Sequence, residues 1–179
     1  FIYQGSLSPY RGVISLIKNW PKNQNYKLTI RSFNNLYFKK LKEYCLSKKS
    51  KNIKFIEIKK FRESIDESIN FLINFDVGII SYSNKSNIFD ICSARKLSHY
   101  VQSELPILTS DIKDSKNIVE KYKIGEIYKS DNVVNFKNSL KKFKVKNLVN
   151  YKKNVIDFKF RHYNFNNFSK MYKKIYEEK

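Results

Sequence analysis

Two short segments, far apart in the sequence, carry the residues best suited to chemistry. The first, GSLSPYRG, begins at Gly5 and places Arg11 directly before Gly12, where a helix is predicted to start. A glycine at the end of a strand lets a ligand approach the backbone closely, and a helix N-terminus attracts phosphate groups. Arg11 would therefore lie beside a bound anion. Taken alone, the segment fits an ordinary turn with a solvated arginine equally well.

The second segment, SARKLSHYVQSELPIL, predicts a helix that leads into a strand. Ser93 suits the N-cap position, so Arg95 and Lys96 fall in the first turn, where the helix dipole disfavours cations. Cations are tolerated there when an anion lies beside them. Leu97 belongs to the buried face by its spacing. His99 lies off that face, towards an opening, although a lone histidine is more often structural.

Other candidates are weaker. The backbone of the loop at Ile58, Lys59 and Lys60 could cover a nucleobase, but it also fits a solvated turn. Asp90, just before the second segment, fits a surface aspartate or a contact to the ligand. The sequence contains no P-loop, no GxGxxG and no cluster with metal-ligand spacing. The two main segments together therefore predict two loops that meet over a diphosphate.

Alternating strand and helix patterns supply the elements that must position these loops. Such alternation predicts a parallel sheet covered by helices on both faces, and ligands of such sheets bind at the carboxyl ends of the strands. We therefore expect a three-layer Rossmann-like α/β domain with a parallel sheet of about six strands, plus C-terminal helices. The expected strands are 1–4, 26–31, 53–58, 77–81, 106–109 and 126–128, and the expected helices are 12–20, 36–48, 62–74, 93–103, 115–122 and 132–143.

The net charge of +20 is unevenly distributed. Residues 18–60 carry 13 lysines and arginines against two glutamates, and residues 141–179 carry 12 against three acidic residues, whereas residues 61–140 are nearly neutral. Only five of the 36 basic residues are arginine, the residue that best contacts nucleic-acid bases and phosphates. Compositional bias explains much of the excess, and an anionic membrane surface is the functional alternative. We expect no nucleic-acid partner.

The chain length of 179 residues predicts one domain with its own core. Cys45 and Cys92 are far apart and fit free thiols in a reducing compartment. No apolar run is long enough to span a membrane. The chain starts inside a predicted strand and without methionine, which indicates a piece of a longer protein. Residues 164–179 predict an amphipathic helix that packs on a domain or contacts a membrane surface.

The two segments resemble motifs of a known family: the C-terminal, donor-binding domain of GT-B glycosyltransferases, near the retaining group 1 (family 4-like) enzymes of bacterial polysaccharide and lipopolysaccharide synthesis. The first segment is similar to the family's strand–Gly–helix opening, and the second to a branch that reads Ser-Pro-x-Lys-Leu-x-Glu-Tyr before a Gly-x-Pro strand. The likeness covers residues 1–145. The matching residues are Gly5, Arg11, Gly12, Ser93, Lys96, Leu97, Tyr100 and Pro106.

The resemblance implies a hexosyltransferase that uses a nucleotide-diphosphate sugar as donor and needs no metal or other cofactor. Arg11 and Lys96 would be catalytic, because they would neutralise the departing diphosphate. Residues 1–145 would bind the donor, and residues 146–179 would form a helical tail on this domain or on an absent N-terminal acceptor domain. We expect a cytoplasmic protein, peripheral at the inner membrane face. The expected donor-binding residues are Gly5, Ser6, Ile58, Lys59, Asp90, Ser93, Leu97 and His99.

Several positions depart from the family pattern. His99 stands where the family has the glutamate that holds the ribose, and Ile91 stands where it has its first acidic residue. Ala94 replaces a proline and Glu104 replaces a glycine. These departures leave open a degenerate domain without catalytic activity. A basic nucleic-acid-binding module is the other alternative, although most aromatic residues lie at core spacing.

Overall fold

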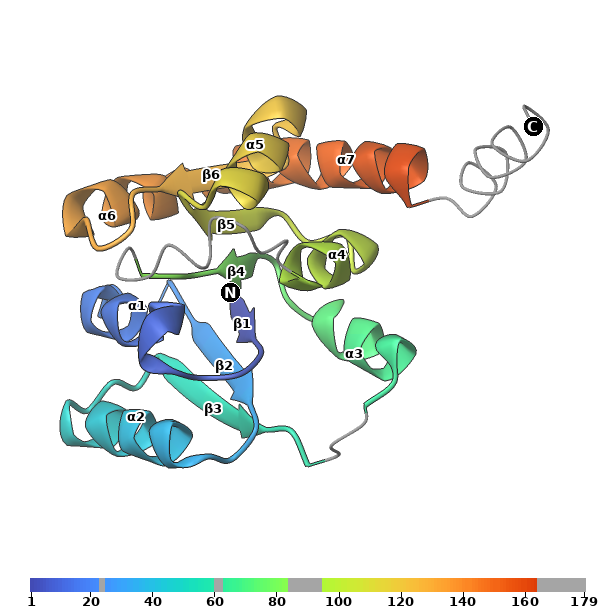
Figure 1. Cartoon of the computed structure of the whole chain (residues 1–179). Coiled ribbons are helices and arrows are strands. Elements are labelled where there is room, and N and C mark those ends of the chain that lie inside the picture. The colour runs from blue at the N-terminus through green and yellow to red at the C-terminus, as the bar shows by residue number, and fades with distance from the viewer. Residues whose placement is uncertain (23–24, 60–62, 84–94, 164–179) are drawn as a thin grey trace.

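In the computed structural model, the described residues (1–22, 25–59, 63–83 and 95–163) form one parallel sheet with helices on both faces (Figure 1). The strand order is β3-β2-β1-β4-β5-β6, and every neighbouring pair is parallel. The expected Rossmann-like α/β architecture is therefore confirmed. The strands are β1 Ile2–Gln4, β2 Leu28–Ser32, β3 Ile53–Glu57, β4 Gly78–Ile80, β5 Ile107–Ser110 and β6 Gly125–Tyr128.

Seven α-helices and a 3₁₀ turn connect and cover the strands in this part of the chain. In Figure 1, α1 and α2 lie on one side of β1 and β2, and α3 and α4 lie on the other side. The turn and helices are η1 Pro9–Arg11, α1 Val13–Asn19, α2 Leu36–Ser47, α3 Ile65–Leu72, α4 Arg95–Gln102, α5 Lys113–Tyr122, α6 Val133–Lys141 and α7 Val145–His162.

Alternate residues of the strands serve two separate cores, as the period of two requires. Tyr3 and Ile79 pack with α1, α2 and α6, whereas Ile2 and Ile80 pack with α3, α4, α5 and α7. All four side chains are fully buried. The sheet is thus covered on both faces, which explains the continuously apolar strands in the sequence.

Most predicted elements are present, and their bounds shift for local reasons. The helix expected from residue 62 begins at Ile65, because Ser64 and Glu67 form a reciprocal capping box at its start. The helix expected from Ser115 begins two residues earlier, at Lys113. The predicted tail helix over 164–179 lies outside the described residues.

Tyr100 anchors α4 to the centre of the sheet. Its hydroxyl accepts a hydrogen bond from the Gln4 backbone N–H at 3.0 Å and donates to the Ile79 carbonyl at 3.1 Å. The ring lies against Gly78, where an added Cβ would come within 2.4 Å of it. The glycine in β4 thus allows α4 to pack closely against β1 and β4.

Helix α7 packs on the same domain along both of its halves, and Leu148 and Tyr151 of the first half lie against the core that contains Tyr3. Val155 and Phe158 are buried in the core that α4 and α5 share, and Figure 1 shows α7 running beside α5. Four other apolar side chains of α7 remain exposed at helical spacing: Val145, Val149, Ile156 and Phe160.

Candidate active site

The site lies where the strand order reverses. The chain continues from β1 to one side through β2 and β3, and to the other side through β4, β5 and β6. The loops after β1 and β4 therefore diverge and leave a crevice at the carboxyl ends of the strands, which is the usual ligand site of open α/β sheets. Gly5 and Arg11 come from the first loop, and Tyr82 follows β4.

Arg11 is held at the start of α1 by a tight local turn. It ends η1, and the next residue, Gly12, adopts the left-handed conformation with φ of 66°. A Cβ on Gly12 would lie 2.7 Å from the Ser81 hydroxyl, so the turn needs glycine both for its angle and for its space. The Arg11 Nη1 donates to the Tyr82 hydroxyl at 2.7 Å, and the guanidinium lies 5.0 Å from the ring centre.

Lys96 approaches the same tyrosine from α4. Its Nζ lies 5.2 Å from the ring centre of Tyr82 and 5.2 Å from that of Tyr3. Burial, and then repulsion from Arg11, lower the pKa of Lys96 from its ordinary value of 10.5 to about 7. Among the described residues, no carboxylate forms a salt bridge with Lys96. The two cations thus converge on one point, and an anion bound there would relieve their repulsion.

Gly5 makes room for the lysine. Its φ of 138° lies in the region that favours glycine, and an added Cβ would lie 2.9 Å from Cε and 3.3 Å from Nζ of Lys96. The segment GSLSPYRG therefore contributes a cation, Arg11, and also leaves space at Gly5 for the side chain of Lys96. A side chain at Gly5 would displace the Lys96 ammonium from this position.

These residues border a cleft of about 560 Å³. Three cationic side chains, Arg11, Arg95 and Lys96, line the cleft. The Glu63 carboxylate and apolar side chains line it as well. The remaining lining residues are Gln4, Gly5, Ser6, Phe33, Ile58, Ser64, Ile65, Ser68, Tyr82 and His99. The lining therefore combines charged and apolar side chains in one cleft.

A buried polar network supports the floor of the cleft. Arg31 ion-pairs with Glu63 and donates to the Gln4 side chain at 2.8 Å, and Gln4 in turn donates to the Ser68 hydroxyl at 2.6 Å. The Ser68 hydroxyl lies 3.5 Å from Nδ1 of His99. Burial, and then the charge of Arg95, lower the pKa of His99 from its usual value, so the ring is neutral near pH 7.

The structure brings six of the ten sequence-predicted residues to this cleft: Gly5, Ser6, Arg11, Ile58, Lys96 and His99. Leu97 lies instead in the core, with 4% of its surface exposed. Lys59 is exposed and does not line the cleft. Asp90 and Ser93 lie outside the described residues.

Sequence reasoning missed Tyr82 and the polar network. Tyr82 lies two residues after the end of β4, so its place at the carboxyl edge of the sheet could have identified it. Gln4, Arg31 and Ser68 gave no such signal, because their contacts join three different elements. In the part of the chain that the structure describes, no cluster of metal-binding side chains occurs, and no helix there is long and apolar enough to cross a membrane.

The chain has the fold of the C-terminal domain of group 1 GT-B glycosyltransferases. The C-terminal domain of the group 1 glycosyl transferase LpcC from Francisella tularensis matches with a TM-score of 0.71 and 14% identity, over 92% of this chain and 85% of that one. WaaG, a glycosyltransferase involved in lipopolysaccharide biosynthesis, matches with a TM-score of 0.62 and 15% sequence identity, over 88% of this chain. AviGT4, a glycosyltransferase involved in avilamycin A biosynthesis, matches with a TM-score of 0.62 and 12% sequence identity, over 87% of this chain.

At these identities the similarity concerns the fold. No family model and no curated protein sequence matches the chain. The chain spans 42% of the WaaG chain and 44% of the AviGT4 chain, so it corresponds to less than half of those enzymes.

Proposed function

We propose that the chain is the donor-binding part of a glycosyltransferase that transfers a hexose from a nucleotide-diphosphate sugar. One observation carries this proposal: Arg11 and Lys96 converge on Tyr82 at the point where the strand order reverses. A diphosphate carries charge that two adjacent cations bind well. The cleft is also large enough for a nucleotide, since ligand pockets range from about 300 to 1,000 Å³.

The same pair would act in catalysis. When the glycosyl bond to the diphosphate breaks, negative charge increases on the departing phosphate oxygen. Cations fixed in a partly buried cleft stabilise that charge without reorganisation. Lys96 would be fully protonated when the diphosphate is bound, because the nearby anion raises its pKa. In this proposal the two residues need no metal ion to neutralise the leaving group.

The other cleft residues would hold the rest of the donor. Gly5 and Ser6 would present backbone N–H groups to the phosphates, and the backbone at Ile58 would cover the base. Neutral His99, with Ser68 behind it, would contact the ribose or the sugar. We propose the same contact role for Asp90 and Ser93, whereas Leu97 would act through the packing of α4.

The acceptor, a glycan or lipid-linked saccharide of surface polysaccharide synthesis, would bind to a second domain that this chain does not include. Residues 1–145 would form the donor domain and the tail from 146 would connect the two. A cytoplasmic position at the inner membrane face would suit a lipid-linked acceptor.

Calorimetric titration with UDP, GDP, ADP and CDP tests the donor site. We expect one diphosphate to bind, and Arg11→Gln to weaken that binding by roughly 10–100-fold, since hydrogen bonds from charged groups contribute about 1.5–3 kcal/mol. The exposed Lys137→Gln on α6 is the control and should bind normally. Absence of binding by all four diphosphates would instead support a degenerate domain.

A further inference from the structure

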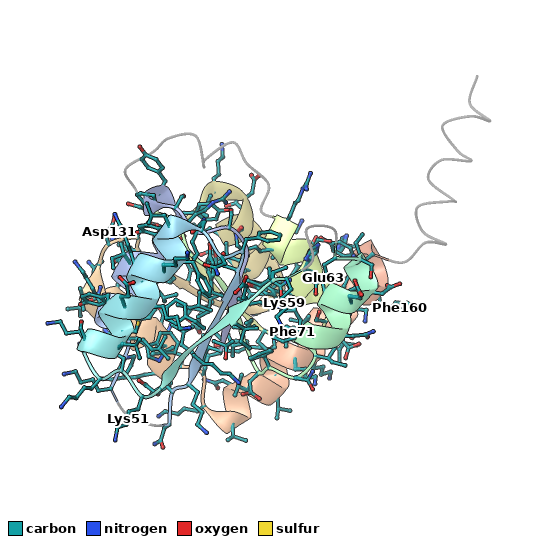
Figure 2. All side chains as sticks on the ribbon, turned by 90° about the horizontal axis from the view of Figure 1, so that it is seen from below. Lys51, Lys59, Glu63, Phe71, Asp131 and Phe160 are labelled. Carbon is teal, nitrogen blue, oxygen red and sulfur yellow. The ribbon has the colours of Figure 1, made fainter. Side chains whose placement is uncertain are left out.

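A second concave surface lies between the end of α2 and the start of β3. It is a groove of about 360 Å³. Figure 2 shows Lys51, on its rim, at the opposite end of β3 from Lys59 and Glu63. The donor cleft lies at the carboxyl ends of the strands, so the two sites are separate. The groove residues are Lys42, Cys45, Leu46, Lys49, Ser50, Lys51, Ile53 and Phe55.

The floor of the groove is apolar. Cys45, Ile53 and Phe55 form it, and Leu46 stands beside it with 69% of its surface exposed. Burial raises the pKa of the Cys45 thiol to about 11, so the thiol stays uncharged. The groove therefore offers an exposed leucine and an uncharged floor to an apolar ligand group.

The rim is cationic. Residues 36–54 contain seven lysines against one acidic residue, Glu43, and the groove lining contains three lysines and no carboxylate. The turn after α2 fixes part of this rim. Lys49 adopts φ of 51° and donates its N–H to the Leu46 carbonyl at 3.0 Å, and Ser50 donates to the Cys45 carbonyl at 3.0 Å.

We propose that this lysine-rimmed groove docks the domain onto the anionic surface of a lipid bilayer. The lysines would contact lipid phosphates, and Leu46 would enter the boundary between headgroups and acyl chains. Polybasic segments bind such surfaces, and neighbouring apolar side chains add to the binding. The inference depends on the charge and the apolar floor of the groove, and it holds whether or not the donor cleft binds a nucleotide.

The geometry favours lipid over nucleic acid. Single-stranded nucleic acid requires exposed aromatic faces for stacking, but Phe55 is only half-exposed and packs edge to face on Phe38 at 5.4 Å. The groove instead exposes an aliphatic side chain. A second copy of the chain is also a poor occupant, because it would bring lysine-rich rims together.

Co-sedimentation of the chain with vesicles tests the proposal. We expect binding to phosphatidylcholine vesicles that contain phosphatidylglycerol, weakened by salt, and little binding to phosphatidylcholine alone. Each lysine near an anionic membrane strengthens binding roughly fivefold, so the triple variant Lys42→Glu, Lys49→Glu, Lys51→Glu should bind about a hundredfold more weakly. The control is a second triple variant with the same change of charge on exposed lysines of α6 and α7, near the other edge of the sheet at β6: Lys137→Glu, Lys141→Glu, Lys146→Glu.

A second pair of variants tests the apolar part. Leu46→Ser should weaken binding by roughly fivefold, because it removes apolar area that would enter the bilayer, whereas Val149→Ser on α7 should bind normally. Thermal unfolding verifies that each variant folds. Equal losses in the two triple variants, equal binding to uncharged vesicles, or unchanged binding of Leu46→Ser would overturn the proposal. Preferential binding of an oligonucleotide at the groove would overturn it in favour of nucleic acid.

Discussion

Replacement of Lys96 by methionine should make the domain more stable and should weaken the binding of a nucleoside diphosphate in the cleft. The pKa of Lys96 falls from 10.5 to about 7 because the ammonium is buried and lies close to Arg11. A fall of that size corresponds to roughly 5 kcal/mol against the charged form. The cleft is open and water reduces this cost, so we expect Lys96→Met to raise the free energy of unfolding by about 1–2 kcal/mol at pH 6.

Thermal unfolding measures the first half of this prediction. For a chain of this length, each kcal/mol shifts Tm by about 2–4 °C, so Tm should rise by about 2–8 °C. Methionine keeps most of the apolar stem that packs near Tyr3 and Tyr82. The control, Lys137→Met on the exposed side of α6, should change stability by less than about 0.5 kcal/mol.

Titration with the preferred nucleoside diphosphate measures the second half, and we expect roughly 10–100-fold weaker binding for Lys96→Met. A variant with lower Tm would show that Lys96 is not a desolvated charge. Unchanged affinity, with the control also unchanged, would show that its ammonium does not contact the diphosphate. Either result would refute the argument from convergent cations.

The lowered pKa of Lys96 leads to two expected pH dependences. Between pH 7 and 10.5, Lys96 keeps its proton in the unfolded chain and loses it in the folded chain. The free energy of unfolding, measured in denaturant, should therefore increase with pH over this range. Over the same range of pH, calorimetry should show a decreasing affinity for the diphosphate, because Lys96 of the unliganded protein loses its positive charge. Gly5→Ala should lose diphosphate affinity and about 1–3 kcal/mol of stability by denaturant unfolding, because the new Cβ is strained and displaces Lys96. Tyr100→Phe should cost about 1–3 kcal/mol in the same assay, because the Gln4 N–H loses its acceptor; no loss would mean that water replaces the hydroxyl. Glu104→Gly should raise Tm slightly, because Glu104 has φ of 58°, and a lower Tm would mean that its side-chain contacts outweigh the strain.

The sequence predicted the layers well because the strands are continuously apolar and the helices are amphipathic. Those patterns depend on local periodicity, which a single chain displays. The order of the strands was not predicted, because the apolar patterns show which residues form strands and not which strands are neighbours. The start of α3 depends on the cap at Ser64, and the Ser64–Glu67 spacing of that capping box is visible in the sequence.

Prediction of the site was less complete, for a different reason. Arg11 was found because it lies between a strand-ending glycine and a predicted helix start, where a phosphate would bind. Lys96 was found because a cation is unusual in the first turn of a helix. Leu97 was placed both in the core and at the ligand, and the structure keeps it in the core. The contacts among Arg31, Gln4 and Ser68 join β2, β1 and α3, and sequence periodicity carries no information about such side-chain contacts.

The hydroxyl of Tyr100 restricts the motion of α4 relative to the sheet. Because it bonds to β1 and to β4 at once, α4 cannot tilt or slide without breaking contacts at the middle of the sheet. Lys96, which α4 carries, is held in place relative to the sheet by the same hydroxyl. A movement that closes or opens this cleft would therefore have to come from outside α4 and the central strands.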